Sequence, residues 1–174
     1  MKRLGPSLAV GLLIGSSTAQ AENILYCNDY NVGYDRMGGA LDELTSVHSI
    51  TRTTSLSDCE SRISSGGWDL VIFAVQNWSY SSPTFNSYVS GGGVAIMQDW
   101  TRDGSRGGTC GVSYSSTNFS TMTIDDSRLS AGLPSASVSL SNPGWGTFSM
   151  SFTITDGGDN LATSSYGTSA IGLT

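Results

Sequence analysis

The stretch Leu70-Val71-Ile72-Phe73-Ala74-Val75 is an uninterrupted apolar run that ends at Gln76. A strand without polar alternation is typical of the interior of a parallel sheet, where both faces are covered. Residues 24–27 and 94–97 are similar apolar runs, so they predict two more buried strands. The β-branched and hydroxyl-bearing residues 49–54 predict a fourth, more exposed strand.

A helical pattern lies between each pair of these strands. The first helix is predicted by an apolar face at helical spacing, formed by Tyr34, Met37, Leu41 and Leu44. The second has a capping box from Ser57 to Glu60, turns Leu56, Cys59 and Ile63 inward, and ends at Gly66-Gly67. The third begins at Ser82-Pro83, buries Phe85, Tyr88 and Val89, and ends at residues 91–93. This alternation predicts right-handed crossovers and a mainly parallel sheet.

The second half of the chain is β-rich and has a different pattern. Residues 101–120 are mostly Gly, Ser and Thr, which predicts a loop or irregular insertion. Residues 148–154 alternate as in a half-exposed strand, and residues 161–165 and 169–173 predict a closing hairpin. No later residues cover this last strand, so we expect an unpaired sheet edge there, or a longer natural chain.

The first 21 residues have the features of a secretory signal peptide. Lys2 and Arg3 precede the apolar residues 8–14, and Ala19-Gln20-Ala21 is a small-x-small cleavage pattern. A membrane anchor is the less favoured alternative, because the apolar run is too short to span a bilayer. We therefore expect cleavage before Glu22, a single α/β domain over residues 22–174, and a secreted or periplasmic location.

Composition excludes several classes of partner and cofactor. The chain has 8 Lys+Arg against 14 Asp+Glu, so nucleic acid and anionic membrane surfaces are not expected partners. The single histidine, His48, and the absence of a C-x-x-C motif give no metal-binding pattern, and no cofactor is expected.

Of the three cysteines, Cys27 and Cys110 are both expected at the carboxyl edge of the sheet while Cys59 faces inward, so we expect a Cys27–Cys110 disulfide.

Three predicted strands end in residues that combine an amide or a carboxylate with an aromatic ring. These residues are Asn28, Asp29 and Tyr30, then Gln76, Asn77 and Trp78, then Gln98, Asp99 and Trp100. If the strand order is 2-1-3-4, all three ends lie on one rim of the sheet. Amides, carboxylates and flat rings are suited to polar ligands such as sugars. The alternative is that these strand ends are simply solvated and the rings cover the edge of the core.

Several segments together resemble the class I glutamine-amidotransferase-like superfamily, nearest its trehalose-utilisation (ThuA-type) branch. The segments that carry the resemblance are residues 24–30, 68–72, 88–97, 126–134, and 161–162 through 170–171. The Gly91-Gly92-Gly93 junction into the next strand is the most specific of them. The resemblance implies a flavodoxin-like three-layer sandwich whose functional edge lies at the carboxyl ends of the strands.

The sequence departs from that superfamily at the catalytic positions. The amidotransferases place a nucleophilic cysteine after the strand that corresponds to residues 94–97, where this chain has Gln98-Asp99-Trp100. The later His-x-Glu pair is absent, and His48 is expected at the opposite, amino edge of the sheet as a solvated structural histidine. Cys27 has no base in obvious reach, so an inert thiol or half-cystine is favoured over a nucleophile. Nitrogen transfer from glutamine is therefore not expected.

Two classes of function remain open. One is an exported, non-catalytic domain that binds a polar small molecule or carbohydrate, with Asn28, Asp29, Tyr30, Asn77, Trp78, Gln98, Asp99 and Trp100 as its site. The other is a sugar-related hydrolase that uses Asp29 and Asp99 as an acid/base or metal-holding pair. The scarcity of histidine and lysine favours the binding domain. In either case we expect Asp99 to be reachable by solvent.

Overall fold

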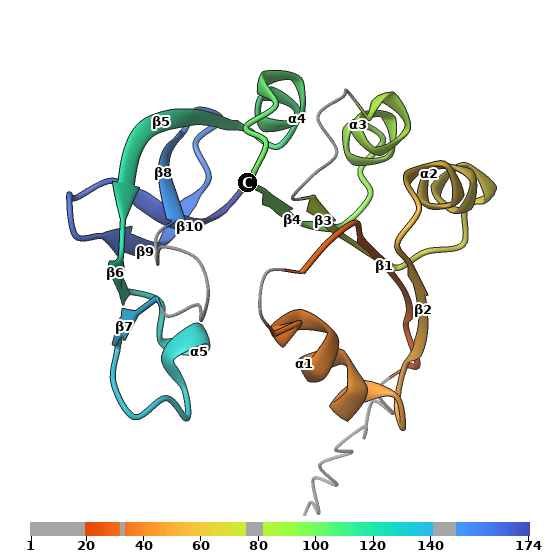
Figure 1. Ribbon diagram of the computed structural model, residues 1–174, viewed down its shortest axis with the longest axis horizontal. Coiled ribbons are helices and arrows are strands. Elements are labelled where there is room, and N and C mark those ends of the chain that lie inside the picture. Colours follow the sequence, from red (N-terminus) through yellow and green to blue (C-terminus); the bar gives the residue numbers. More distant parts are fainter. Residues whose placement is uncertain (1–19, 32–33, 76–81, 141–148) are drawn as a thin grey trace, which may run out of the picture.

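The computed structural model describes residues 20–31, 34–75, 82–140 and 149–174. All but the last two residues of the expected signal peptide, and the candidate site residues Asn77 and Trp78, lie outside these ranges. The fold is mixed α/β, with a four-stranded parallel sheet and a separate six-stranded antiparallel sheet (Figure 1). Among the residues described, no helix is long and apolar enough to cross a membrane.

The parallel sheet forms as the sequence predicts. Its elements, in chain order, are β1 (Asn23–Asn28), α1 (Arg36–Leu44), β2 (Ser49–Thr53), α2 (Leu56–Ser65), β3 (Leu70–Val75), α3 (Pro83–Ser90) and β4 (Ala95–Asp99). The strand order is β2-β1-β3-β4 and all three pairings are parallel, which confirms both the order and the direction expected from the sequence.

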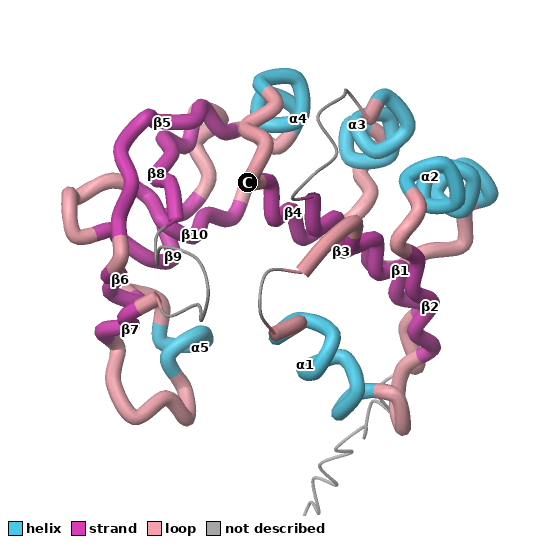
Figure 2. Tube along the Cα trace, in the orientation of Figure 1, coloured by secondary structure: helices cyan, strands magenta, loops and turns pink. Residues whose placement is uncertain are grey.

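Helices cover both faces of this sheet, so its central strands have no polar face. Alternate residues of β1 and β3 pack under α2 and α3 on one face, where the rings of Phe73 and Phe85 stack with centroids 4.4 Å apart. The intervening residues, such as Tyr26 and Ile72, pack against Leu41 of α1 on the other face. Figure 2 shows α2 and α3 on one side of the strands and α1 on the opposite side.

The start of α2 differs from the prediction by two residues. Ser55, whose backbone is extended, is the N-cap, and its hydroxyl accepts a hydrogen bond from the Asp58 amide at 3.4 Å. Ser57 already lies in the first turn, so the predicted cap at Ser57 is wrong. The buried face of α2 and its end at Gly66, where φ is +72°, are as predicted.

The buried apolar face of α1 is narrower than the spacing of the apolar residues in the sequence predicts. Met37 and Leu41 pack on the sheet, but Tyr34 precedes the helix and is 69% exposed. Leu44 is also exposed, because it ends the helix beyond the edge of the packed face. His48 lies just before β2, at the amino edge as predicted, and its Nδ1 accepts a hydrogen bond from the Glu22 amide at 3.2 Å.

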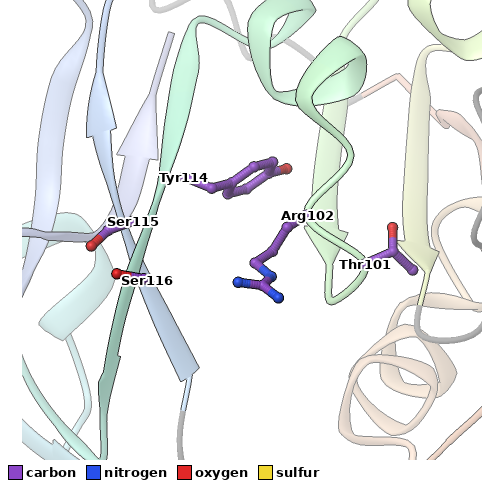
Figure 3. A pocket seen from close by; sticks show the side chains of 5 residues that line it. All are labelled: Thr101, Arg102, Tyr114, Ser115 and Ser116. Atoms are coloured by element: carbon purple, nitrogen blue, oxygen red, sulfur yellow. The ribbon is translucent and has the colours of Figure 1, made fainter.

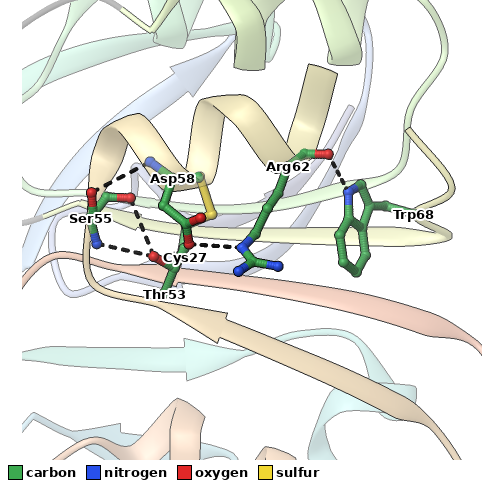
Figure 4. Close-up of a disulfide and its surroundings, with 7 residues drawn as sticks. Cys27, Thr53, Ser55, Asp58, Arg62 and Trp68 are labelled. Carbon is green, nitrogen blue, oxygen red and sulfur yellow. Dashed lines mark hydrogen bonds and ion pairs between the residues drawn. A yellow bond between two sulfur atoms is a disulfide. The ribbon is translucent and has the colours of Figure 1, made fainter. Parts of the chain in front are cut away.

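The disulfide joins Cys27 to Cys59, so the expected Cys27–Cys110 pair is wrong (Figure 4). Cys27 points from β1 toward α2, and Cys59 lies on the buried face of that helix, with the two Cα atoms 5.8 Å apart. An inward-facing cysteine was therefore the correct partner, because the strand residue also faces the core. Cys110 is a free, half-buried thiol beside Met97, with 3.7 Å between the sulfur atoms.

The second half forms an antiparallel sheet of order β5-β8-β10-β9-β6-β7. It comprises α4 (Gly104–Thr109), β5 (Val112–Phe119), β6 (Thr121–Ile124), α5 (Ser127–Ser130), β7 (Ser137–Ser139), β8 (Ser149–Ile154), β9 (Asp159–Ser164) and β10 (Ser169–Leu173). Residues 101–120, predicted to be irregular, contain α4 and β5. The cap at Asp103 starts α4, because its carboxylate accepts a hydrogen bond from the Arg106 amide at 2.9 Å.

The last strand has partners on both sides. β10 pairs antiparallel with β9, which confirms the predicted hairpin, and also with β8. The unpaired edge predicted at residues 170–173 is therefore wrong. The prediction placed this strand at the edge of a sheet, whereas it lies inside the antiparallel sheet, whose outer strands are β5 and β7.

Candidate functional site

The carboxyl ends of β1, β3 and β4 meet at one edge of the parallel sheet, as predicted, but their polar residues do not form one open surface. Asn28 is buried and holds the turn after β1, because its amide donates to the Tyr26 hydroxyl and to Asn31 Oδ1, both at 2.7 Å. Its Oδ1 also accepts from the Tyr30 amide at 3.2 Å. These contacts make Asn28 a structural residue.

The same turn leads into α1 through Asp35. The Asp35 carboxylate accepts hydrogen bonds from the Tyr26 hydroxyl at 2.8 Å and from the Gly38 amide at 2.6 Å. Burial, reinforced by the hydrogen bond to Asp35, raises the pKa of Tyr26. The phenol therefore stays protonated and acts as a fixed donor.

The remaining predicted site residues lie in different surroundings. Tyr30 is exposed, and Asp29 and Trp100 are half-buried. Gln98 is exposed and lies beside Ala74 on the α1 face of the sheet. Successive strand residues point to opposite faces, so Gln98 and Asp99 cannot line the same surface.

Asp99 is not reachable by solvent, which corrects the expectation from the sequence. Its carboxylate forms an ion pair with Arg106, Nε to Oδ2 3.2 Å, and both side chains are fully buried. It also accepts from the Thr101 hydroxyl at 2.6 Å and from the Tyr114 hydroxyl at 3.1 Å. Asp99 thus connects the end of β4 to α4 and to β5.

These contacts keep Asp99 ionised. Burial alone would raise its pKa, but hydrogen bonds from Thr101 and Arg106, with the charge of Arg106, outweigh burial and lower the pKa. Arg106 also donates to Ser82 Oγ at 3.4 Å, which fixes the guanidinium against the start of α3. A carboxylate held in this way is a poor general acid or base.

The loop after β4 wraps around the Asp99 carboxylate. The amides of three consecutive residues, Thr101, Arg102 and Asp103, donate to it at 2.8, 3.1 and 3.1 Å. Arg102 has a φ of +57°, and it is the non-glycine residue with positive φ in the part of the chain that the structure describes. Asp99 therefore sets the shape of the loop that presents Arg102.

An open hollow lies between this loop and β5. Its volume is about 350 Å³, and it is lined by Thr101, Arg102, Tyr114, Ser115 and Ser116. Figure 3 shows the ring of Tyr114 and the side chain of Arg102 extending into the space between the two elements, with Ser115 and Ser116 along the strand. The hollow thus combines a cation, an aromatic ring and the hydroxyl groups of Ser115 and Ser116, whereas the Thr101 hydroxyl is occupied by Asp99 and Arg106.

Sequence reasoning located this edge of the sheet but missed all five lining residues. All five lie in residues 101–120, the segment predicted to be a loop or irregular insertion. One signal was present, since Arg102 and Arg106 closely follow a strand-terminal aspartate in a chain with few cations. Among the described residues, no group of three or more His, Cys, Asp and Glu side chains could hold a metal ion.

Comparison of the chain with protein-family models, with curated proteins and with solved structures found no match. The chemistry of the hollow is therefore the basis for inferring a function. A guanidinium and hydroxyl groups offer hydrogen bonds to a polar ligand, and a phenol ring offers an apolar face.

Proposed function

We propose that the protein is an exported, non-catalytic domain that binds a small polar ligand, a carbohydrate, at the carboxyl edge of its parallel sheet. The observation that carries the proposal is the hollow lined by Arg102, Tyr114 and three hydroxyl-bearing residues. Sugars combine hydroxyl groups with C–H patches, and sites that bind them combine hydrogen-bonding groups with aromatic rings. The volume of about 350 Å³ falls within the range of roughly 300–1,000 Å³ found for small-molecule sites.

The location of the hollow supports the proposal. In open α/β sheets, ligands bind outside the carboxyl ends of the strands. Arg102 follows β4 directly at this edge, while Tyr114 comes from the antiparallel sheet. A site built from two packed elements is held in place by both, which reduces the freedom lost on binding.

Export is supported by the cysteines and by the first 21 residues. A buried disulfide between Cys27 and Cys59 persists in oxidising compartments and is rare in the cytosol. The signal-peptide pattern that ends at Ala21 favours the same location. We therefore place the protein outside the cytoplasm, in the periplasm or secreted.

The strand order supports a distant relation to the glutamine-amidotransferase-like superfamily. Flavodoxin-like sheets have the order 2-1-3-4-5, and the parallel sheet here has the order β2-β1-β3-β4 with helices on both faces. We propose that residues 23–99 are a flavodoxin-like layer structure whose catalytic positions have been lost. After Asp99 the chain continues into the antiparallel sheet instead of a fifth parallel strand.

The hydrolase alternative has less support. A paired-carboxylate mechanism needs one carboxyl group that exchanges a proton near the working pH. Asp99 is buried, ion-paired to Arg106 and has a lowered pKa, so it does not suit that role beside Asp29.

Binding to a glycan array, followed by titration of each hit, tests the proposal. Ser116→Ala removes an exposed hydroxyl from the hollow and should weaken binding several-fold, since a hydrogen bond contributes about 1 kcal/mol. Ser113→Ala is the matched control, because Ser113 is exposed on the same strand but does not line the hollow. Absence of any glycan hit, or equal losses in the two variants, would show that the proposal is wrong.

A further inference from the structure

We propose that the ligand of this hollow is an acidic saccharide, whose carboxylate or sulfate group pairs with Arg102. The inference rests on the proposed function and names the class of carbohydrate. It depends on two observations about Arg102. Its guanidinium has no ion-pair partner among the described residues, and its backbone has a positive φ.

Arg102 differs from the other arginines in the part of the chain that the structure describes. Four of them form ion pairs and a fifth lies over an aromatic ring: Arg52 with Asp42, Arg62 with Asp58, Arg106 with Asp99, Arg128 with Asp126, and Arg36 over Tyr34. The guanidinium of Arg102 has no such partner among the described residues, and the residue is exposed and lines the hollow. It is therefore the cation that is available to a ligand.

The backbone of Arg102 is held in a conformation that a non-glycine residue rarely adopts. A φ of +57° is unfavourable for a side chain with a Cβ atom. Such strain persists where the surroundings enforce it, and it is concentrated at functional sites. Here Asp99 enforces it by accepting hydrogen bonds from the amides of Thr101, Arg102 and Asp103.

The nearby carboxylates are already neutralised or turned away. The charge of Asp99 is balanced by Arg106, and its oxygens are enclosed by donors. The Asp103 carboxylate accepts from the Arg106 amide at the start of α4 and does not line the hollow. An oxyanion in the hollow would meet the guanidinium of Arg102 with hydroxyl groups nearby, and such charge-assisted hydrogen bonds are stronger than neutral ones.

The net charge of the whole chain makes this contact specific. A formal charge of −6 supplies no general attraction for anions, so the attraction must come from Arg102 at short range. A neutral sugar would leave the guanidinium without a charged partner. The protein should therefore bind acidic saccharides more tightly than neutral ones of the same size.

The experiment compares each acidic saccharide with a neutral counterpart. The probes are trigalacturonate with its methyl ester, and a sulfated disaccharide with its desulfated form, titrated into the purified protein by calorimetry. We expect the acidic member of a pair to bind at least tenfold more tightly, because a hydrogen bond between charged groups is stronger than one between neutral groups. Arg102→Gln should abolish this difference, and Arg102→Lys should keep part of it.

Arg128→Gln is the matched control, because it removes an equal charge from an exposed residue of α5 that does not line the hollow. Equal binding of acidic and neutral members, or an acidic preference that survives Arg102→Gln, would overturn the inference but leave the proposed function standing. If inorganic sulfate binds the hollow as tightly as the acidic saccharides do and displaces them, the inference that the ligand is a saccharide would be wrong. No binding by any saccharide, acidic or neutral, would overturn both proposals.

Discussion

The Asp99 carboxylate and the Arg106 guanidinium form an ion pair that is completely excluded from solvent, with 3.2 Å between Oδ2 and Nε. Asp99 ends a parallel strand and Arg106 lies on α4, which leads into the antiparallel sheet. Tyr114 extends the contact, because its hydroxyl donates to Asp99 from β5. The same carboxylate shapes the loop of Arg102, so the junction between the two sheets and the candidate site share one group.

Loss of the Asp99 charge should destabilise the protein. Asp99→Asn leaves Arg106 buried without its counterion, and breaking a buried pair in this way costs roughly 3–5 kcal/mol. Tyr114→Phe removes only one hydrogen bond to the same carboxylate and should cost about 2 kcal/mol, because the acceptor is charged. Urea unfolding of both variants measures these free energies. Similar losses of unfolding free energy in the two variants would show that the ion pair contributes no more to stability than the single hydrogen bond.

Stability should fall in acid as Asp99 becomes protonated. Its pKa in the folded state lies below the unfolded value of about 3.9, so its contribution is complete above that pH and is lost as the pH falls through the folded pKa. Asp126, held by Arg128 at a pKa of about 2, adds to the loss in the same direction. Between pH 6 and pH 2, the melting temperature should therefore fall more steeply for the wild type than for Asp99→Asn. Parallel curves would contradict this assignment.

The parallel sheet could be predicted because its signals are local. The buried run at residues 70–75 and the glycines at 66–67 and 91–93 each mark one boundary, and the alternation of strands and helices implies a parallel sheet. The strand order is expected from the resemblance to flavodoxin-like folds. The antiparallel sheet could not be placed in the same way. Residues 112–119 are hydroxyl-rich, and their pairing with β8 depends on contacts 30 or more residues away in sequence.

The candidate site shows the same division. Sequence reasoning placed Asp99 at the correct edge, but residue type alone does not say whether a carboxylate faces solvent or a buried arginine. That depends on α4, which brings Arg106 back against the strand end. The predicted disulfide is wrong for a related reason. The prediction places Cys27 at the edge of the sheet, whereas its side chain faces the core.

Reduction of the Cys27–Cys59 disulfide should destabilise the fold. The bond closes a loop with a sequence separation of 32, for which the loss of unfolded-state entropy corresponds to roughly 3–4 kcal/mol. Urea unfolding with and without a thiol reductant measures the difference. Cys110→Ala should retain the full effect of the reductant, because Cys110 is not part of the bond. A reductant without effect on the wild type would show that the disulfide is absent.

Cys110 should be the one cysteine that alkylates without reduction, and only slowly in the native protein. Burial, with the charge of nearby Asp99, raises the pKa of its thiol to about 11, so little thiolate is present at pH 8. Iodoacetamide labelling followed by mass spectrometry should show slow modification in buffer and fast modification in urea. Fast native labelling, or label on Cys27 or Cys59, would contradict the structure.

Arg102→Gly should stabilise the fold while it removes the cation of the site. Glycine adopts a φ of +57° without the penalty of about 1 kcal/mol that a Cβ atom carries, and the exposed Arg102 side chain loses little packing. Arg102→Ala is the matched control, because it loses the same charge but keeps the Cβ. Urea unfolding should rank the glycine variant about 1 kcal/mol above the alanine variant. Both should lose any preference for acidic saccharides. A glycine variant no more stable than the alanine variant would show that the loop is unstrained, and the backbone would then no longer argue for a functional Arg102.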